Sequence, residues 1–182
     1  MAKILQRDAP ILREVAHEVP LGEITTPPIQ KIVREMKKAL ASQDDGVAIA
    51  APQIGHSLRI FVMSGKVMEL IKAKDGIDET YDDLVFINPK IVKTSKETQL
   101  MEEGCLSVRY LYGHVKRAKK ATVEGYDENG KYFTRGGSSL IAQIFQHEID
   151  HLDGILFIDK AKNLVDMPPE DAEKEFTDAT PQ

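Results

Sequence analysis

The chain has 182 residues, 42% of them hydrophobic, and carries a formal net charge of −5 at pH 7. Such a length and apolar content suffice for one domain with a buried core, and the single cysteine excludes an internal disulfide, as in proteins of a reducing compartment. No apolar run approaches the length of a membrane span, and the N-terminal residues lack the apolar core of a secretory signal. No basic face is concentrated enough for phosphate binding. We therefore expect a cytoplasmic protein without membrane or nucleic-acid partners.

The first third of the chain is predicted to contain an arm, a helix and a segment of small residues. The arm covers residues 8–19, and apolar residues at helical spacing continue from Pro27 to near Ser42. The segment 46–55, GVAIAAPQIG, has little side-chain bulk, so its backbone can approach another molecule closely. Gln53 is its one side chain with strong hydrogen-bonding capacity. Tight core packing and a surface amide are the alternative explanations.

The middle of the chain is predicted to form short strands. The β-rich runs are, in chain order, residues 59–63, 84–87, 91–94, 122–126 and 131–134. The polar, acidic segment 64–84 is interpreted as a surface excursion between strands. Asn88 and Pro89 indicate a turn, and Asn129 with Gly130 indicates the tip of a β-hairpin.

The most informative stretch is HEIDH, residues 147–151. Apolar residues before it recur at spacings of three and four, which predicts a helix over 138–151. On that helix His147 and His151 stand one turn apart, about 6 Å at Cβ, where both can bind one metal ion with Glu148 beside the open coordination position. A solvated helix face is the alternative, but the apolar flanks favour a buried helix, in which unpaired imidazoles are costly.

A third metal ligand is then expected, and the single cysteine is the candidate. Gly104 leaves room for the thiol of Cys105 to reach a metal, which would deprotonate it. A set of one cysteine and two histidines leaves a fourth position for water, as is typical of a catalytic site. An inert buried thiol, the commoner fate of a lone cysteine, is the alternative.

The C-terminal part is expected to be simpler. Gly154 interrupts the chain, residues 155–158 are predicted to form a strand or a closing turn, and residues 161–182 an acidic, loosely ordered tail. The expected organisation is therefore one catalytic metallohydrolase domain over residues 1–160, followed by the tail. The order of helix, short strands and helix predicts an α+β fold with antiparallel pairing.

At this point the sequence resembles a known family. The segments GVAIAAPQIG (46–55), EGCLS (103–107) and QHEIDH (146–151) are similar in order and spacing to the three motifs of peptide deformylases. The resemblance extends over about residues 5–160. It implies antiparallel β-sheets packed around a central helix that carries HEIDH. It also implies hydrolysis of the N-formyl group from the formyl-methionine of newly synthesised proteins, with release of formate.

The resemblance also assigns roles to the metal site. It implies that Cys105, His147 and His151 hold Fe²⁺, which Zn²⁺, Ni²⁺ or Co²⁺ can replace. Glu148 would be the general base and then the general acid.

The resemblance further implies a set of substrate contacts. Gln53 and the backbone N–H of Leu106 would bind the formyl oxygen. The other implied substrate-binding residues are Gly46 and Glu103 at the entrance and Val47 and Ile144 at the methionine pocket.

Two positions depart from the family pattern. Ala48 stands where most relatives have glycine, and Arg109 lies where relatives usually have proline, so the rim of the substrate cleft is expected to differ while the reaction does not. The implied partners are N-formyl-methionyl nascent chains near the ribosome, although the acidic tail does not resemble the basic docking helix of some relatives. An HExxH peptidase and a catalytically silent metal-binding relative are the alternatives. Cys105 and Gln53 argue against the first, and the complete set of catalytic positions argues against the second.

Overall fold

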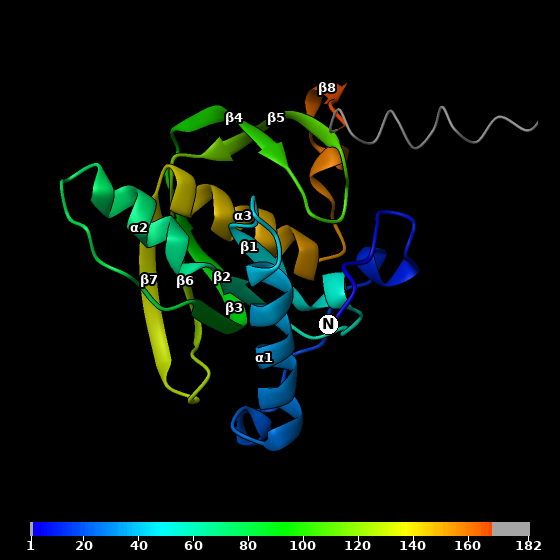
Figure 1. Ribbon diagram of the computed structural model, residues 1–182, viewed down its shortest axis with the longest axis vertical. Coiled ribbons are helices and arrows are strands. Elements are labelled where there is room, and N and C mark those ends of the chain that lie inside the picture. The colour runs from blue at the N-terminus through cyan, green and yellow to red at the C-terminus, as the bar shows by residue number, and fades with distance from the viewer. Residues whose placement is uncertain (1, 169–182) are drawn as a thin grey trace, which may run out of the picture.

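Two antiparallel β-sheets enclose helix α3 (Leu140–Leu152) in the computed structural model, which describes residues 2–168 (Figure 1). The larger sheet has the strand order β1-β2-β3-β6-β7, formed by Ala48–Ala50, Ile60–Met63, Leu84–Thr94, Lys120–Tyr126 and Tyr132–Ser138. The smaller sheet has the order β4-β5-β8, formed by Thr98–Gly104, Leu111–Ala118 and Lys162–Asp166. The predicted α+β architecture around a central HEIDH helix is confirmed.

Part of the larger sheet is covered on both faces, and strand β2 illustrates how its sequence allows this. Successive side chains of a strand point to opposite faces, and all four residues of β2 are apolar and buried. Ile60 and Val62 pack against helix α1 (Pro27–Ala41), whereas Phe61 and Met63 face the side covered by α3. A strand that is buried on both faces therefore has consecutive apolar residues instead of alternating apolar and polar ones.

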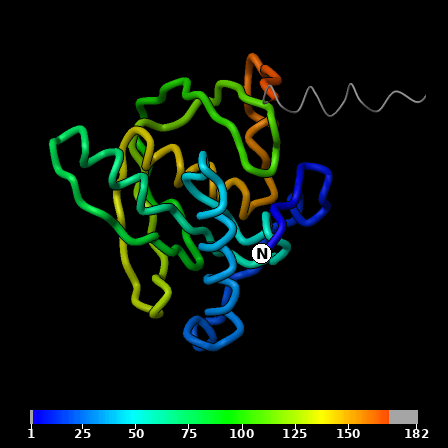
Figure 2. Tube along the Cα trace, in the orientation of Figure 1, coloured from blue at the N-terminus to red at the C-terminus, as the bar shows by residue number. Residues whose placement is uncertain are grey.

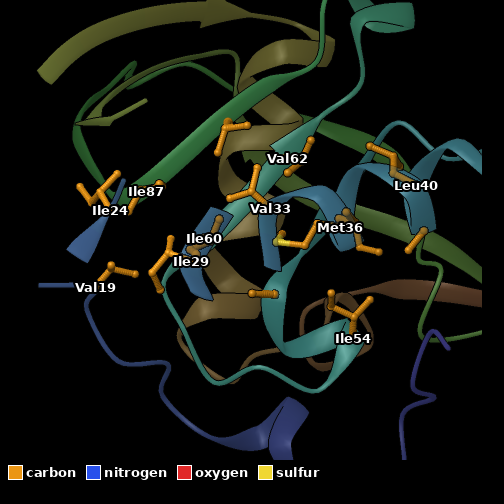
Figure 3. Close-up of a cluster of buried hydrophobic side chains, with 14 of the residues drawn as sticks. Val19, Ile24, Ile29, Val33, Met36, Leu40, Ile54, Ile60, Val62 and Ile87 are labelled. Carbon is orange, nitrogen blue, oxygen red and sulfur yellow. The ribbon is translucent and has the colours of Figure 1, made fainter. Parts of the chain in front are cut away.

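Helix α1 contributes an apolar stripe at helical spacing to the first of these two cores. Figure 3 shows Ile29, Val33, Met36 and Leu40 of this helix pointing toward the strands of the larger sheet. The expected helix beginning at Pro27 is confirmed and ends at Ala41.

Aromatic side chains build the second core, between the larger sheet and α3. The rings of Phe61 and Phe86 stack with centroids 4.3 Å apart, and Phe145 of α3 meets Phe86 edge-on at 5.4 Å. Each fully buried side chain of this size contributes roughly 1.5–3 kcal/mol through the area it removes from water. This core fixes the position of α3 and therefore of the HEIDH motif.

The structure corrects the turn predicted at Asn88 and Pro89. Residues Leu84–Thr94 form one strand, and its pairing with β6 shifts register between Ile87 and Lys90. Asn88 has a positive φ of 51°, and its side-chain amide donates to the carbonyl oxygen of Val19 and accepts from its N–H, each at 2.8 Å. The turn signals therefore mark a bulge that anchors the N-terminal arm to the sheet.

The segment 64–84 contains a helix that was not predicted. Helix α2 covers Gly65–Ala73, and the hydroxyl of Ser64 caps it by accepting from the N–H of Lys66. A side chain at position 65 would clash, because a Cβ there would lie 1.8 Å from the carbonyl oxygen of Tyr81. Gly65 is thus the first residue of the helix, at a position where no side chain fits.

Short 3₁₀ segments connect the remaining elements. They are Pro10–Arg13, Leu21–Glu23, Ala51–Ile54 and Phe157–Asp159. The last of these agrees with the closing turn expected near residues 155–158. The chain that precedes the predicted arm runs beside the segment Ala51–Ile54 (Figure 2), where the N–H of Leu5 donates to the carbonyl oxygen of Gln53 at 2.8 Å.

The predicted tail begins differently from expectation. Residues Lys162–Asp166 form strand β8 and pair antiparallel with β5 instead of being loosely ordered. Backbone hydrogen bonds rather than buried side chains hold this strand, because all five of its residues are exposed. Residues 169–182 of the predicted tail lie outside the described part of the chain. Within residues 2–168, no helix has the length and apolar content needed to cross a membrane.

Candidate metal centre

Helix α3 brings two histidines to one face, as its sequence predicts. The rings of His147 and His151 lie one turn apart with centroids separated by 4.9 Å. His151 is buried and His147 is partly buried. The apolar flanks of the motif place both imidazoles inside the molecule, between the two sheets.

Cys105, which follows the end of β4, completes a cluster with these histidines. Its Sγ lies 3.2 Å from Nε2 of His151, and one ligand atom from each of the three residues lies within 4.8 Å of the others. Gly104 is needed at this point because a Cβ there would lie 2.7 Å from Cε1 of Tyr112. The expected convergence of Cys105, His147 and His151 is therefore observed.

The donor set fits a metal ion. Nδ1 of His147 lies 2.9 Å from Oε2 of Glu103, and an ionised carboxylate can only accept, so Nδ1 is the donor and Nε2 is the nitrogen available to bind a metal. A thiolate and two imidazoles are ligands that zinc and ferrous iron accept. Nδ1 of His151 has no hydrogen-bond partner among residues 2–168.

A buried ion-pair network holds His147 through Glu103. Nε and Nη2 of Arg117 donate to Oε1 and Oε2 of Glu103 at 2.7 and 3.0 Å, and Nη1 donates to Asp150 at 2.6 Å. Burial alone would raise the pKa of Glu103, but the hydrogen bonds to His147 and Arg117 outweigh it and lower the pKa to about 2. Glu103 therefore remains an anion that orients the imidazole.

Glu148 lies beside the cluster with different surroundings. Its side chain is 4% exposed, and its Oε2 has no partner within residues 2–168. Burial raises its pKa to about 7; the positive charge of His147 opposes this rise and the negative charge of Glu103 adds to it. A carboxyl group with such a pKa can both take up and release a proton near neutral pH.

Gln53 is not a surface amide. Its side chain is 1% exposed, and its Oε1 accepts from the N–H of Ala50 at 2.8 Å. Its Nε2 donates to Oγ of Ser107 at 3.0 Å and points at Sγ of Cys105 from 3.6 Å. The amide is thus held with its donor directed at the cysteine segment.

A cavity of about 290 Å³ opens onto these residues. Of the residues implied in catalysis or substrate binding, it is lined by Gln53, Glu148, Leu106, Val47, Glu103 and Ile144. Gly46 is not among its lining residues, so its contact with substrate stays a prediction.

Several lining residues were not identified from the sequence. They are Asp45, Glu102, Val108, Leu140 and Gln143. Helical periodicity could have found Gln143, which lies four residues before His147 and so on the same face of α3. Its amide donates to the carbonyl oxygen of Glu102 at 2.7 Å and joins α3 to β4.

Comparisons with known proteins agree with this site. The family model described as polypeptide deformylase matches residues 1–166. A peptide deformylase of Carboxydothermus hydrogenoformans is 41% identical over 90% of this chain and 95% of its own length. Chloroplastic peptide deformylase 1A of Solanum lycopersicum is also 41% identical over 88% of this chain, which spans 59% of that relative.

A solved structure extends the agreement to three dimensions. The class I type b peptide deformylase of Acinetobacter baumannii, solved with Met-Ala-Ser bound, has a TM-score of 0.76 and 30% identity over 88% of this chain and 99% of its own. The sequence relatives, the fold and the cysteine and histidine cluster point to one conclusion. The chain belongs to the peptide deformylase family, metal-dependent hydrolases that remove the N-formyl group from nascent polypeptides.

Proposed function

We propose that Cys105, His147 and His151 hold the catalytic metal of this deformylase and that Glu148 transfers the proton. The observation that carries the proposal is the cluster of three ligand atoms within 4.8 Å, next to a buried carboxylate oxygen without a partner in residues 2–168. We propose Fe²⁺ as the resident ion, with Zn²⁺, Ni²⁺ or Co²⁺ able to replace it. When bound, such an ion polarises the formyl carbonyl and acidifies water.

Glu148 would carry the proton between the two halves of the reaction. As a carboxylate it accepts a proton from the attacking water, and as a carboxylic acid it delivers that proton to the departing amine. A pKa of about 7 suits both steps, because neither protonation state is strongly favoured near neutral pH. The products are formate and a free N-terminal methionine.

Gln53 would stabilise the negative charge that develops on the formyl oxygen. Its Nε2 is a preorganised donor, because Ala50 fixes the other end of the amide and Ser107 its direction. The backbone N–H of Leu106 is proposed as the second donor.

The substrate would enter through the cavity with its formyl end innermost. Val47 and Ile144 line the cavity and offer an apolar surface to the methionine side chain. The relative solved with Met-Ala-Ser supports a short N-terminal peptide as ligand. The proposed partners are N-formyl-methionyl nascent chains in the cytoplasm, close to the ribosome, with neither nucleic acid nor membrane as a direct partner.

The test is formate release from formyl-Met-Ala-Ser under anaerobic conditions, with the metal content of the protein measured in parallel. We expect rapid release of formate and no cleavage of unformylated Met-Ala-Ser. Cleavage of the unformylated peptide would indicate a peptidase instead. A metal-loaded protein without either activity would indicate a silent relative.

A further inference from the structure

The cavity has two walls that come from distant parts of the chain. One wall is the connection between α1 and β1, which contributes Asp45 and Val47. The other is the connection between β4 and β5, which contributes Cys105, Leu106, Val108, Arg109 and Tyr110. Because both connections line the cavity, a peptide bound in it would lie against them.

A single guanidinium group joins the walls. Nη1 of Arg109 donates to Oδ2 of Asp45 at 2.5 Å, Nη2 donates to Oδ1 at 3.0 Å, and Nη2 also lies 3.2 Å from Oε1 of Gln43. Among residues 2–168, this is the only hydrogen-bonded side-chain contact between the two connections. The side chain of Asp45 is 56% exposed and that of Arg109 23%, which places the pair at the mouth of the cavity.

The backbone of Arg109 is held from the opposite side. Its N–H donates to Oε1 of Gln6 at 3.3 Å, and Nε2 of Gln6 donates to the carbonyl oxygen of Leu106 at 3.0 Å. Gln6 thus fixes the wall that carries Arg109. Through Asp45, the guanidinium group then holds the opposite wall at a fixed distance from this one.

We propose that Arg109, paired with Asp45, is a specificity-determining residue that limits the width of the cavity mouth and disfavours bulky residues directly after the substrate methionine. This inference rests on the proposed function. A bidentate guanidinium–carboxylate pair is directional, so it sets the separation of the walls more closely than a single contact would. Partly exposed ion pairs contribute only about 0–1 kcal/mol to the free energy of unfolding. We therefore expect loss of this pair to change the width of the cavity mouth and to leave the fold intact.

Only the substrate residues that follow the methionine should be affected by the pair of Arg109 and Asp45. The proposed ligands and base lie on α3 and at the inner end of the cavity, and none of them contacts the guanidinium group. Removing the pair should therefore change discrimination between peptides without removing the metal.

The experiment compares kcat/KM for formyl-Met-Ala-Ser with that for formyl-Met-Trp-Ser, anaerobically. We expect wild type to favour the alanine peptide and Arg109→Ala to lower that preference by up to about fivefold, mainly through the KM of the tryptophan peptide. Asp45→Asn should act in the same direction. The exchange Arg109→Asp with Asp45→Arg should restore part of the preference.

Lys119→Ala is the matched control, because Lys119 pairs with Glu97 at 2.6 Å on an exposed surface and neither residue lines the cavity. An unchanged preference in Arg109→Ala and Asp45→Asn, with formate release intact, would overturn the inference while leaving the proposed function standing. Wild type without formate release would overturn the proposed function itself. If Arg109→Ala failed to fold, Asp45→Asn and the exchanged pair would decide.

Discussion

Adjacent residues of α3 face different directions because a helix turns about 100° per residue. His147 points at the cluster with Cys105, whereas Glu148 presents its carboxylate beside it with one oxygen unpartnered within residues 2–168. The sequence alone predicted this separation from the spacing of the motif. It also predicted the third ligand, since the chain has a single cysteine.

Replacing Glu148 by alanine should therefore separate binding from chemistry. We expect the variant to keep its metal and its fold while formate release falls by about 10² to 10⁴, the range assigned to general acid–base catalysis. Metal analysis and steady-state kinetics on formyl-Met-Ala-Ser measure both properties. A variant that purified without metal, or that kept most of its rate, would contradict the role given to Glu148.

Gln53→Ala should lower turnover by about 10² to 10³, the usual loss for one oxyanion donor. The variant also leaves the N–H of Ala50 without its present acceptor, so a small loss of stability is expected. Gln30→Ala is a suitable control, because Gln30 also bridges two segments through its amide but does not line the cavity. Near-normal kinetics in Gln53→Ala would limit its role to packing.

The sequence did not reveal what Glu103 contacts. The resemblance placed it at the entrance, whereas the structure places its carboxylate on His147 and on Arg117 of β5. Glu103 and His147 are 44 positions apart, and neither periodicity nor composition relates residues at such a distance. Only the docking of α3 against the smaller sheet brings them together.

At the scale of elements, local sequence signals identified part of the fold. Helical spacing predicted α1 and α3, a β-rich run predicted β2, and Asn129 with Gly130 predicted the hairpin of β6 and β7. Helix α2 was missed because it is short and lies in a polar segment, and β8 because all of its residues are exposed. Such elements are fixed by neighbours in the fold, which the local sequence does not describe.

Arg117 connects three of these elements and should matter to stability. Its guanidinium group joins Glu103 of β4 and Asp150 of α3, and Arg117→Met would leave the buried Glu103 without this guanidinium partner. Removing one partner of a buried pair typically costs about 3–5 kcal/mol of unfolding free energy. Urea unfolding measures this loss.

Lys119→Met provides the control for Arg117→Met. Its ion pair with Glu97 is exposed, so we expect a change in unfolding free energy of less than about 1 kcal/mol. Equal losses in the two variants would mean that the buried network does not join the sheet and the helix energetically.

At the scale of the whole molecule, the proposed division into a catalytic domain and a tail can be tested by truncation. Removing residues 162–182 deletes β8, which pairs with β5 next to the cavity wall, and should lower the thermal unfolding temperature. Removing only residues 169–182 should leave both the unfolding temperature and formate release close to wild type. Equal stability of the two truncated chains would show that β8 contributes little.

The central position of α3 has a consequence for how the protein is made. Chains leave the ribosome N-terminus first, so the five strands of the larger sheet are synthesised up to Ser138 before the helix that covers Phe61 and Phe86. Until residues 140–152 emerge, that aromatic face has no cover from α3, and two of the three proposed metal ligands do not yet exist. One late-synthesised helix therefore supplies both the cover of the aromatic face and two of the proposed ligands.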